Sequence, residues 1–182
     1  MTAPRHASRR NLTLLPVLAL FVGRAAAAPP PTVDQVDVER YLGRWYEIAL
    51  LPNMFQGGCA RNTNATYGLR DDGLISVTNR CTTKGGDTVS ITGVAKPQDP
   101  ARNAKLKVSF FSLFGIQFFL GDYWVMEVGE DYDHALVGHP TRKWGWILAR
   151  EPHPPEERIQ AWLEKMADFG YDPDKFVRTP QT

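Results

Sequence analysis

The sequence predicts an all-β fold, an eight-stranded antiparallel up-and-down β-barrel with one C-terminal α-helix packed outside it. From residue 44 onward, apolar and polar residues alternate with a period of two, which is typical of strands that bury one face. Turn-forming residues interrupt this pattern at short intervals, and near the C-terminus the period becomes helical. Antiparallel strands with one apolar face must hide that face, and eight of them can close a barrel around side chains or one small ligand.

The first 27 residues are expected to be a signal peptide that takes no part in the fold. A basic leader with Arg9 and Arg10 precedes an apolar run and the small-residue end RAAAA, which predicts cleavage after Ala27 and export to the periplasm. The segment SRRNL also fits a twin-arginine signal, so both export routes stay open. No cysteine lies near the cleavage position, so we expect no lipid anchor, and an association with the outer membrane would need another contact. Residues 28–40 then lead into a single domain over residues 41–182.

The predicted barrel strands follow one another along the chain, with turns such as RDDGL and KGGD between them. Alternation is cleanest where Leu106, Val108 and Phe110 face one way while Lys105 and Lys107 face the other. The predicted strands are Arg44–Leu51, Thr63–Leu69, Ile75–Cys81, Thr88–Lys96, Ala104–Phe110, Tyr123–Val128, His134–Gly138 and Trp144–Ala149.

A helix is predicted in the segment PHPPEERIQAWLEKMADFG, which opens with prolines, has two glutamates in its first turn and ends at Gly170. Its apolar residues recur at helical spacing and form one stripe, which we expect to pack on the outside of the barrel wall. The stripe consists of Ile159, Trp162, Leu163, Met166 and Phe169. A short ninth strand is expected at Phe176–Arg178.

Both cysteines, Cys59 and Cys81, belong to the part of the chain that is expected to be exported, and an oxidising compartment favours a disulfide between them. Loop-entropy models assign such a bridge roughly 3 kcal/mol. A regular hairpin around Asp72 sets Cys59 opposite residue 84 or 85. The bridge therefore requires a bulge or a loop excursion in this hairpin.

Three short motifs, in order along the chain, resemble the conserved regions of the lipocalins. GRWYEIA resembles the Gly-x-Trp region of their first strand, GDYWV resembles the second region and WILAR the third. The resemblance extends over essentially the whole mature chain and is greatest to the bacterial lipocalins and to apolipoprotein D. It implies that Trp45 plugs the closed end of the barrel, that Arg150 lies across the Trp45 ring, and that Gly43 lets the chain turn into the barrel floor.

The resemblance also implies a cavity that holds a lipid, either a fatty acid or a lysophospholipid, for transport or storage in the cell envelope in support of membrane maintenance. The residues expected to line this cavity are Tyr67, Leu69, Val77, Asn79, Leu106, Val108, Phe110, Trp124 and Trp146. Two alternatives stay open. A barrel filled by side chains would favour an interaction module without a ligand, and two inward carboxylates, Glu47 and Glu127, would favour an enzyme acting on a bound isoprenoid.

The segment FFSLFGIQFFLG is unusually apolar for a connection between two strands. Soluble proteins seldom expose so much contiguous apolar surface without a purpose. We therefore expect a lip over residues 111–120 that contacts a membrane or a second subunit, formed by Leu113, Phe114, Ile116 and Phe118. The alternative is a lid that folds inward over the cavity.

Other classes of protein find little support in the composition. The 21 basic and 20 acidic residues are balanced and no basic tract is present, so we expect no nucleic-acid partner. The four histidines are spread along the chain without metal-ligand spacing, and no Gly-x-Ser-x-Gly or phosphate-binding loop occurs. The sequence therefore predicts a binding protein without metal or cofactor rather than an enzyme.

Overall fold

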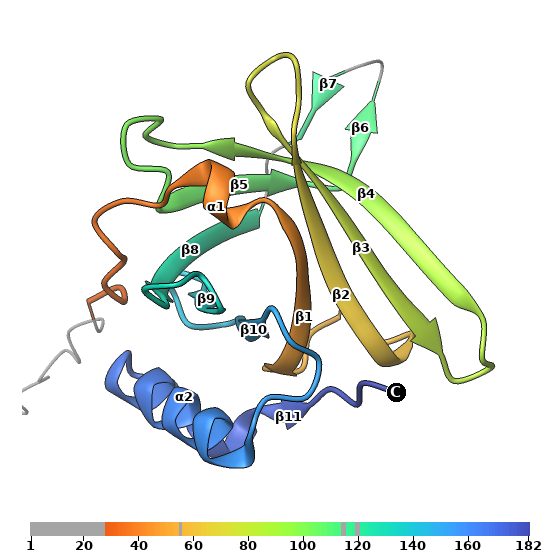
Figure 1. Ribbon diagram of the computed structural model, residues 1–182. Coiled ribbons are helices and arrows are strands. Elements are labelled where there is room, and N and C mark those ends of the chain that lie inside the picture. Colours follow the sequence, from red (N-terminus) through yellow and green to blue (C-terminus); the bar gives the residue numbers. More distant parts are fainter. Residues whose placement is uncertain (1–27, 55, 114–115, 119–120) are drawn as a thin grey trace, which may run out of the picture.

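The computed structural model describes residues 28–54, 56–113, 116–118 and 121–182, so the predicted signal peptide lies outside the described residues. The chain forms a nine-stranded antiparallel sheet in which β10 pairs back with β1, so that eight strands close into the predicted barrel (Figure 1). The barrel strands are β1 (Gly43–Leu50), β2 (Cys59–Leu69), β3 (Ile75–Thr83), β4 (Thr88–Pro97), β5 (Lys105–Ser109), β8 (Gly121–Val128), β9 (His134–Gly138) and β10 (Gly145–Ala149). The ninth strand, β11 (Val177–Arg178), extends the sheet at β1.

Every predicted strand is present, and the largest difference in length lies in the hairpin of β2 and β3. β2 begins at Cys59, four residues before the predicted start, and β3 continues to Thr83. Two bulges in β2, before and after Arg61, set Cys59 opposite Thr83. These are the bulges that the sequence analysis required for the bridge. Cys59 and Cys81 form the predicted disulfide, with their Cα atoms 5.6 Å apart.

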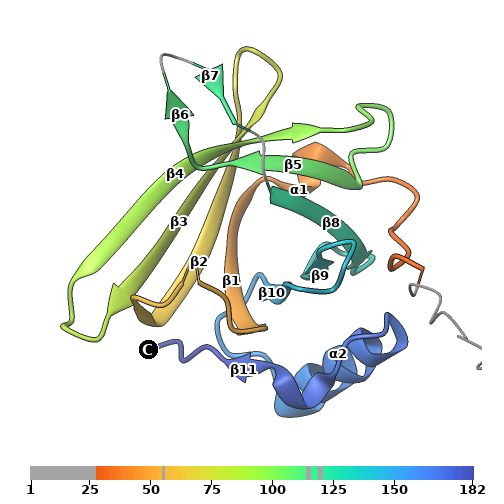
Figure 2. The same cartoon turned by 180° about the vertical axis from the view of Figure 1, so that it is seen from behind.

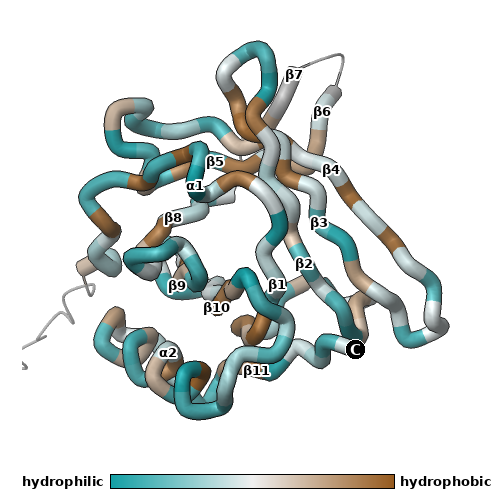
Figure 3. Tube along the Cα trace, in the orientation of Figure 1, coloured by the Kyte–Doolittle hydropathy of each residue, from teal (hydrophilic) through white to brown (hydrophobic). Residues whose placement is uncertain are grey.

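The inner face of the barrel is an apolar core. Alternate residues of the strands point inward. Figure 3 shows hydrophobic and hydrophilic positions interspersed along β3 and β4. The buried members of this inner cluster are Val36, Tyr41, Trp45, Ala65, Tyr67, Ile75, Val77, Ala95, Ala104, Leu106, Val125, Ala135, Val137 and Leu148.

The helix α2 (Glu156–Asp168) covers one side of the barrel, as the apolar stripe predicts. Trp162 and Met166 of the helix pack against the outward residues Met126, Leu136 and Ile147 of β8, β9 and β10. Among the described residues, no helix is long and apolar enough to cross a membrane.

Three short elements were not predicted. The helix α1 (Val38–Tyr41) is capped by the side chain of Asp37 and brings Tyr41 into the inner core. A hairpin of β6 (Ser112–Leu113) and β7 (Ile116–Gln117) lies in the connection between β5 and β8, and the 3-10 helix η1 (Pro173–Lys175) precedes β11. These helices and strands are only two to four residues long, so they cover too few repeats for a helical or strand period to be recognised in the sequence.

Candidate ligand site

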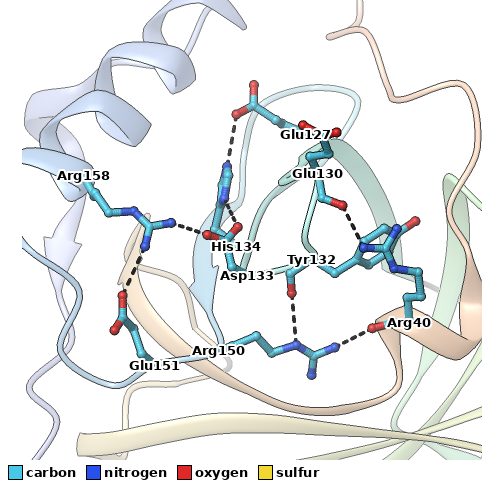
Figure 4. Close-up of polar contacts among 9 residues, drawn as sticks. All are labelled: Arg40, Glu127, Glu130, Tyr132, Asp133, His134, Arg150, Glu151 and Arg158. Carbon is cyan, nitrogen blue, oxygen red and sulfur yellow. Dashed lines mark hydrogen bonds and ion pairs between the residues drawn. The ribbon is translucent and has the colours of Figure 1, made fainter.

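The closed end of the barrel is formed by a stack of an arginine on a tryptophan. Trp45 is fully buried, and the guanidinium carbon of Arg150 lies 3.8 Å from the centroid of its ring. Arg150 also donates hydrogen bonds to three backbone carbonyls, those of Arg40 at 2.7 Å, Arg44 at 2.8 Å and Tyr132 at 3.2 Å. The predicted neighbours therefore meet, and one side chain joins the entry to β1, the β8–β9 connection and the end of β10 (Figure 4).

Gly43 stands at the beginning of β1 with a φ of +91°, in the left-handed region that favours glycine. A Cβ atom there would lie 3.4 Å from Nη1 of Arg150. The glycine thus allows both the turn into the barrel floor and the close approach of the arginine.

Three tyrosine hydroxyl groups meet inside the barrel above this floor. The hydroxyls of Tyr41 and Tyr123 are 2.8 Å apart, and Tyr67 donates to Tyr123 at 2.9 Å. Burial raises the pKa of Tyr67 to about 12 and raises those of Tyr41 and Tyr123 well above the usual value, so all three phenols stay neutral at physiological pH. Two hydrogen bonds use two of the three hydroxyl protons, so one proton finds no acceptor within the trio and is free to donate to another group.

The wall around the tyrosines is apolar, and its residue on β4 is small. Val77, Val137 and Leu148 are buried on the inner face, while Ala95 of β4 belongs to the same cluster. Between Tyr41, Tyr67 and Leu106 the side chains leave a void of only about 10 Å³, room for no more than one water molecule, so this part of the barrel is filled by side chains. The predicted lining residues Tyr67, Val77 and Leu106 are buried in this inner cluster, and Val108 packs against it.

The inner face becomes solvent-exposed toward the far end of β4. Ile91 pairs with Asn79 and Val89 with Cys81. Asn79 and Cys81 lie two and four positions after the buried Val77 on β3, so Ile91 and Val89 are on the same, inner face. Their exposed fractions are nevertheless 51% and 46%, because β5 pairs with β4 only along Val94–Pro97. An apolar inner face that opens to solvent is the mouth of the barrel.

A polar group lies on the wall between β1 and β10. Glu47 pairs with the inward Leu148, is 4% exposed, and accepts hydrogen bonds from Nε2 of Gln56 at 2.5 Å and from Oγ1 of Thr179 at 2.7 Å. Nε1 of Trp146 donates to Oε1 of the same Gln56 at 3.2 Å. Burial raises the pKa of Glu47, and the two hydrogen bonds lower it by less.

Two predicted lining residues do not line the buried interior of the barrel. Trp124 lies on the outer face, since its neighbours Tyr123 and Val125 point inward and the ammonium of Lys105 lies 4.2 Å from its ring centroid. Leu69 is 58% exposed because β2 continues past the beginning of β1, where Tyr67 already pairs with Gly43.

Phe110 lies at the end of β5 with its ring against Gly93 of β4. A Cβ atom on Gly93 would lie 2.6 Å from that ring, so the glycine makes room for it. Phe110 is 41% exposed and belongs to the mouth rather than to the buried wall. Asn79 pairs with Ala65 and Ile91 on the inner face of the same region.

The predicted lip is described only in part. Phe114 lies outside the described residues, and Leu113 and Ile116 form the backbone pair of the β6–β7 hairpin. Phe118 is exposed, and its ring centroid lies 5.7 Å from that of the exposed Phe111. An aromatic pair therefore stands on the surface beside the hairpin.

The two carboxylates of the enzyme alternative do not converge. Glu47 faces the barrel interior, whereas Glu127 lies on the outside, with Oε1 3.3 Å from Nε2 of His134 and Oε2 3.9 Å from Nζ of Lys165 on α2. Among the described residues, no group of three or more histidine, cysteine, aspartate or glutamate side chains could hold a metal ion. One inward carboxylate is an anchor and not an acid–base pair.

Sequence reasoning missed three residues of the candidate site, Tyr41, Gln56 and Thr179, because they lie in the short helix α1, a loop and the C-terminal tail. The periodic pattern of strands gives no signal at such positions.

Comparison with known proteins gives a consistent result. A family model described as a lipocalin-like domain matches residues 36–181. Temperature-induced lipocalin-1 of Arabidopsis thaliana is 44% identical over 153 residues, which cover 82% of each chain. The outer membrane lipoprotein Blc of Escherichia coli (strain K12) is 37% identical over 180 residues, covering 93% of this chain and 98% of Blc. Mouse apolipoprotein D (Mus musculus) is 34% identical over 161 residues, covering 84% and 80%. Insecticyanin from the tobacco hornworm Manduca sexta has the same fold, with a TM-score of 0.64 at 21% identity and coverage of 86% and 85%.

Proposed function

This chain belongs to the lipocalin-like family, whose members typically bind small hydrophobic ligands, and we propose that it carries a fatty acid or a lysophospholipid in the cell envelope. Carriage or storage of such a lipid would support membrane maintenance. Export to the periplasm, as the N-terminal segment predicts, would place the protein between the membranes that supply and receive the lipid.

The observation that carries the proposal is the contrast between the two ends of the barrel. The floor is sealed by Trp45 and Arg150, whereas inward apolar residues at the far end of β4, Val89 and Ile91, are about half exposed. Inward apolar side chains in contact with solvent favour an apolar guest, since covering them removes that surface from water. The polar groups inside, the tyrosine hydroxyls and Glu47, favour a guest that is amphipathic rather than a plain hydrocarbon.

The direct test is native mass spectrometry with lipid extraction on protein purified from the periplasm, together with binding of a fluorescent fatty-acid probe. We expect a co-purified single-chain lipid and saturable probe binding. Ile91→Trp, which fills the mouth from the inner face, should weaken probe binding strongly, whereas Thr92→Trp, one position along on the outer face, should not. Absence of both lipid and probe binding would contradict the proposal and favour an interaction module.

A contact with the membrane surface is the second part of the proposal. The exposed pair of Phe111 and Phe118 stands beside the β6–β7 hairpin, which lies on the opposite side of the molecule from α2 and β11 in both views (Figures 1 and 2). Aromatic side chains exposed in such a cluster favour an interfacial contact. This contact would hold the protein at the surface of the outer membrane.

The membrane contact is tested by liposome flotation of the double variant Phe111→Asp, Phe118→Asp. We expect a clear loss of liposome association, while Val177→Asp, which charges an equally exposed apolar residue on β11, leaves it unchanged. Sedimentation velocity on the same variants separates membrane contact from a homodimer, because a dimer contact through this pair would be lost in solution as well.

A further inference from the structure

Glu47 is a buried carboxylate whose partners are neutral. It lies on the inner face of β1 with 4% of its surface exposed, and its two oxygens accept hydrogen bonds from the amide of Gln56 and the hydroxyl of Thr179. Within the described part of the chain, no lysine, arginine or histidine nitrogen lies within 4.0 Å of its oxygens. The other buried or half-buried carboxylates, such as Asp122 with Lys107 and Asp133 with Arg158, do have such partners.

An ionised carboxylate removed from water without a counter-ion is costly. Burial accordingly raises the pKa of Glu47, but the hydrogen bonds from Thr179 and Gln56 favour its ionised form and reduce that shift. Both partners donate hydrogen bonds, so the surroundings of Glu47 stabilise a negative charge. A cation would complete them by supplying the counter-charge.

A tryptophan of the inner face is linked to this carboxylate through Gln56. The indole of Trp146 packs against the inner core and is tied to Glu47 through Gln56, whose Oε1 accepts from the indole nitrogen. The N–H edge of the indole points to Gln56, so this glutamine joins Trp146 and Glu47 in one hydrogen-bonded group. Gln56 lies in the connection between β1 and β2, so its amide is a donor that an incoming ammonium group can replace at Oε2 of Glu47.

We propose that Glu47 is the subsite for an ammonium group on the lipid, so that the barrel selects ammonium-bearing single-chain amphiphiles over carboxylates. The inference rests on the proposed lipid-binding function and narrows it. An ammonium group gives Glu47 its counter-charge, whereas a fatty-acid carboxylate at the same place would bring two negative charges together. The ammonium could belong to a long-chain amine or to the ethanolamine of a lysophospholipid, which share this chemistry.

The test compares ligands of one chain length. Hexadecylamine, hexadecanol and palmitate displace a neutral fluorescent probe from the wild-type protein, from Glu47→Gln, and from Glu164→Gln as a matched control. Glu164→Gln removes the same charge from the exposed face of α2. We expect hexadecylamine to bind at least about tenfold more tightly than palmitate, which corresponds to about 1.4 kcal/mol. The preference should vanish in Glu47→Gln and persist in Glu164→Gln.

The outcomes separate the two proposals. If none of the three ligands binds the wild-type protein, the lipid-binding function itself fails. If palmitate binds as well as hexadecylamine, or if the preference survives in Glu47→Gln, lipid binding stands and the ammonium subsite is wrong. The wild-type comparison decides this even where Glu47→Gln folds poorly. A second pair, palmitoyl lysophosphatidylethanolamine and lysophosphatidylglycerol, identifies the source: a preference within this pair indicates a headgroup ammonium, and a preference only for hexadecylamine indicates a long-chain amine.

Discussion

Replacing Arg150 by methionine should destabilise the protein more than any other removal of one exposed charge. Methionine keeps much of the apolar contact with Trp45 but loses the cation over the ring and three hydrogen bonds to backbone carbonyls. A partly exposed cation–π contact contributes about 1 kcal/mol, and each hydrogen bond to a carbonyl about 0.5–1 kcal/mol at such a site. We therefore expect a loss of about 2.5–4 kcal/mol in the free energy of unfolding, or a fall in Tm of about 5–15 °C for a chain of this size.

The chain supplies a matched control in Arg158, whose guanidinium also lies over a tryptophan. Its carbon is 4.9 Å from the centroid of Trp162, and its hydrogen bonds go to the side chains of Asp133 and Glu151 rather than to the backbone. Surface ion pairs of this kind contribute about 0–1 kcal/mol. Arg158→Met should thus cost about 1–2 kcal/mol at most, counting its cation–π contact.

The assay is urea unfolding followed by tryptophan fluorescence, with the midpoint and the slope fitted separately. Arg150→Met should lower the midpoint without changing the slope, and by clearly more than Arg158→Met. If the two variants lose the same free energy, or if Arg150→Met loses less than about 1 kcal/mol, the carbonyl contacts do not hold the floor together and the reasoning is refuted.

Three further predictions follow from the same geometry. Replacing Cys59 and Cys81 by alanine should lower the free energy of unfolding by about 3 kcal/mol, because the bridge closes a loop with a sequence separation of 22; reduction of the wild-type protein should give the same shift in urea midpoint. Burial alone would raise the pKa of Asp133, but hydrogen bonds from His134 and Arg158 hold this pKa below its usual value. Ionised Asp133 therefore contributes its full stabilisation above about pH 4, the usual pKa of aspartate, and this stabilisation is lost as the pH falls through the lower pKa of the folded protein. In Asp133→Asn, the free energy of unfolding should fall less steeply with acid below about pH 4. Trp146→Leu should weaken probe binding while Trp124→Leu leaves it unchanged, since only Trp146 faces the interior; equal losses would show that Trp124 also lines the cavity.

The alternation of apolar and polar residues was enough to predict the barrel, because each strand has one face that must be buried. It located all eight barrel strands, the helix α2 and the short strand β11. The stack of Arg150 on Trp45 could be anticipated only from the resemblance to a family, since residues 45 and 150 lie at opposite ends of the barrel sequence. No local pattern joins positions so far apart.

The orientation of Trp124 shows where period-two reasoning fails. Tyr123 and Trp124 are adjacent aromatic residues, so the pattern itself does not say which of them points inward, and a slip of one residue exchanges the two faces. The structure decides by polar contacts: the hydroxyl of Tyr123 has partners inside the barrel, whereas the ring of Trp124 lies against the ammonium of Lys105 outside. Leu69 was assigned to the correct face of β2, but it lies beyond the beginning of β1 and is exposed rather than buried. The sequence of β2 does not show where the neighbouring strand begins.

The C-terminal tail supplies Thr179, the part of the candidate site that the alternation of the strands could not predict. β1 and β2 pair only from Gly43 opposite Tyr67 to Tyr46 opposite Asn64, and beyond that point the tail runs between them. The amide of Gln181 donates to the carbonyls of Glu47 at 2.8 Å and of Thr63 at 3.0 Å, and so bridges the two strands directly. The tail therefore satisfies backbone groups that a closed barrel would otherwise pair with a neighbouring strand. Thr179 of this tail donates a hydrogen bond to Glu47, so a residue more than a hundred positions away completes the surroundings of the buried carboxylate. The polarity around Glu47 therefore depends on the packing of the tail against β1 as much as on β1 itself.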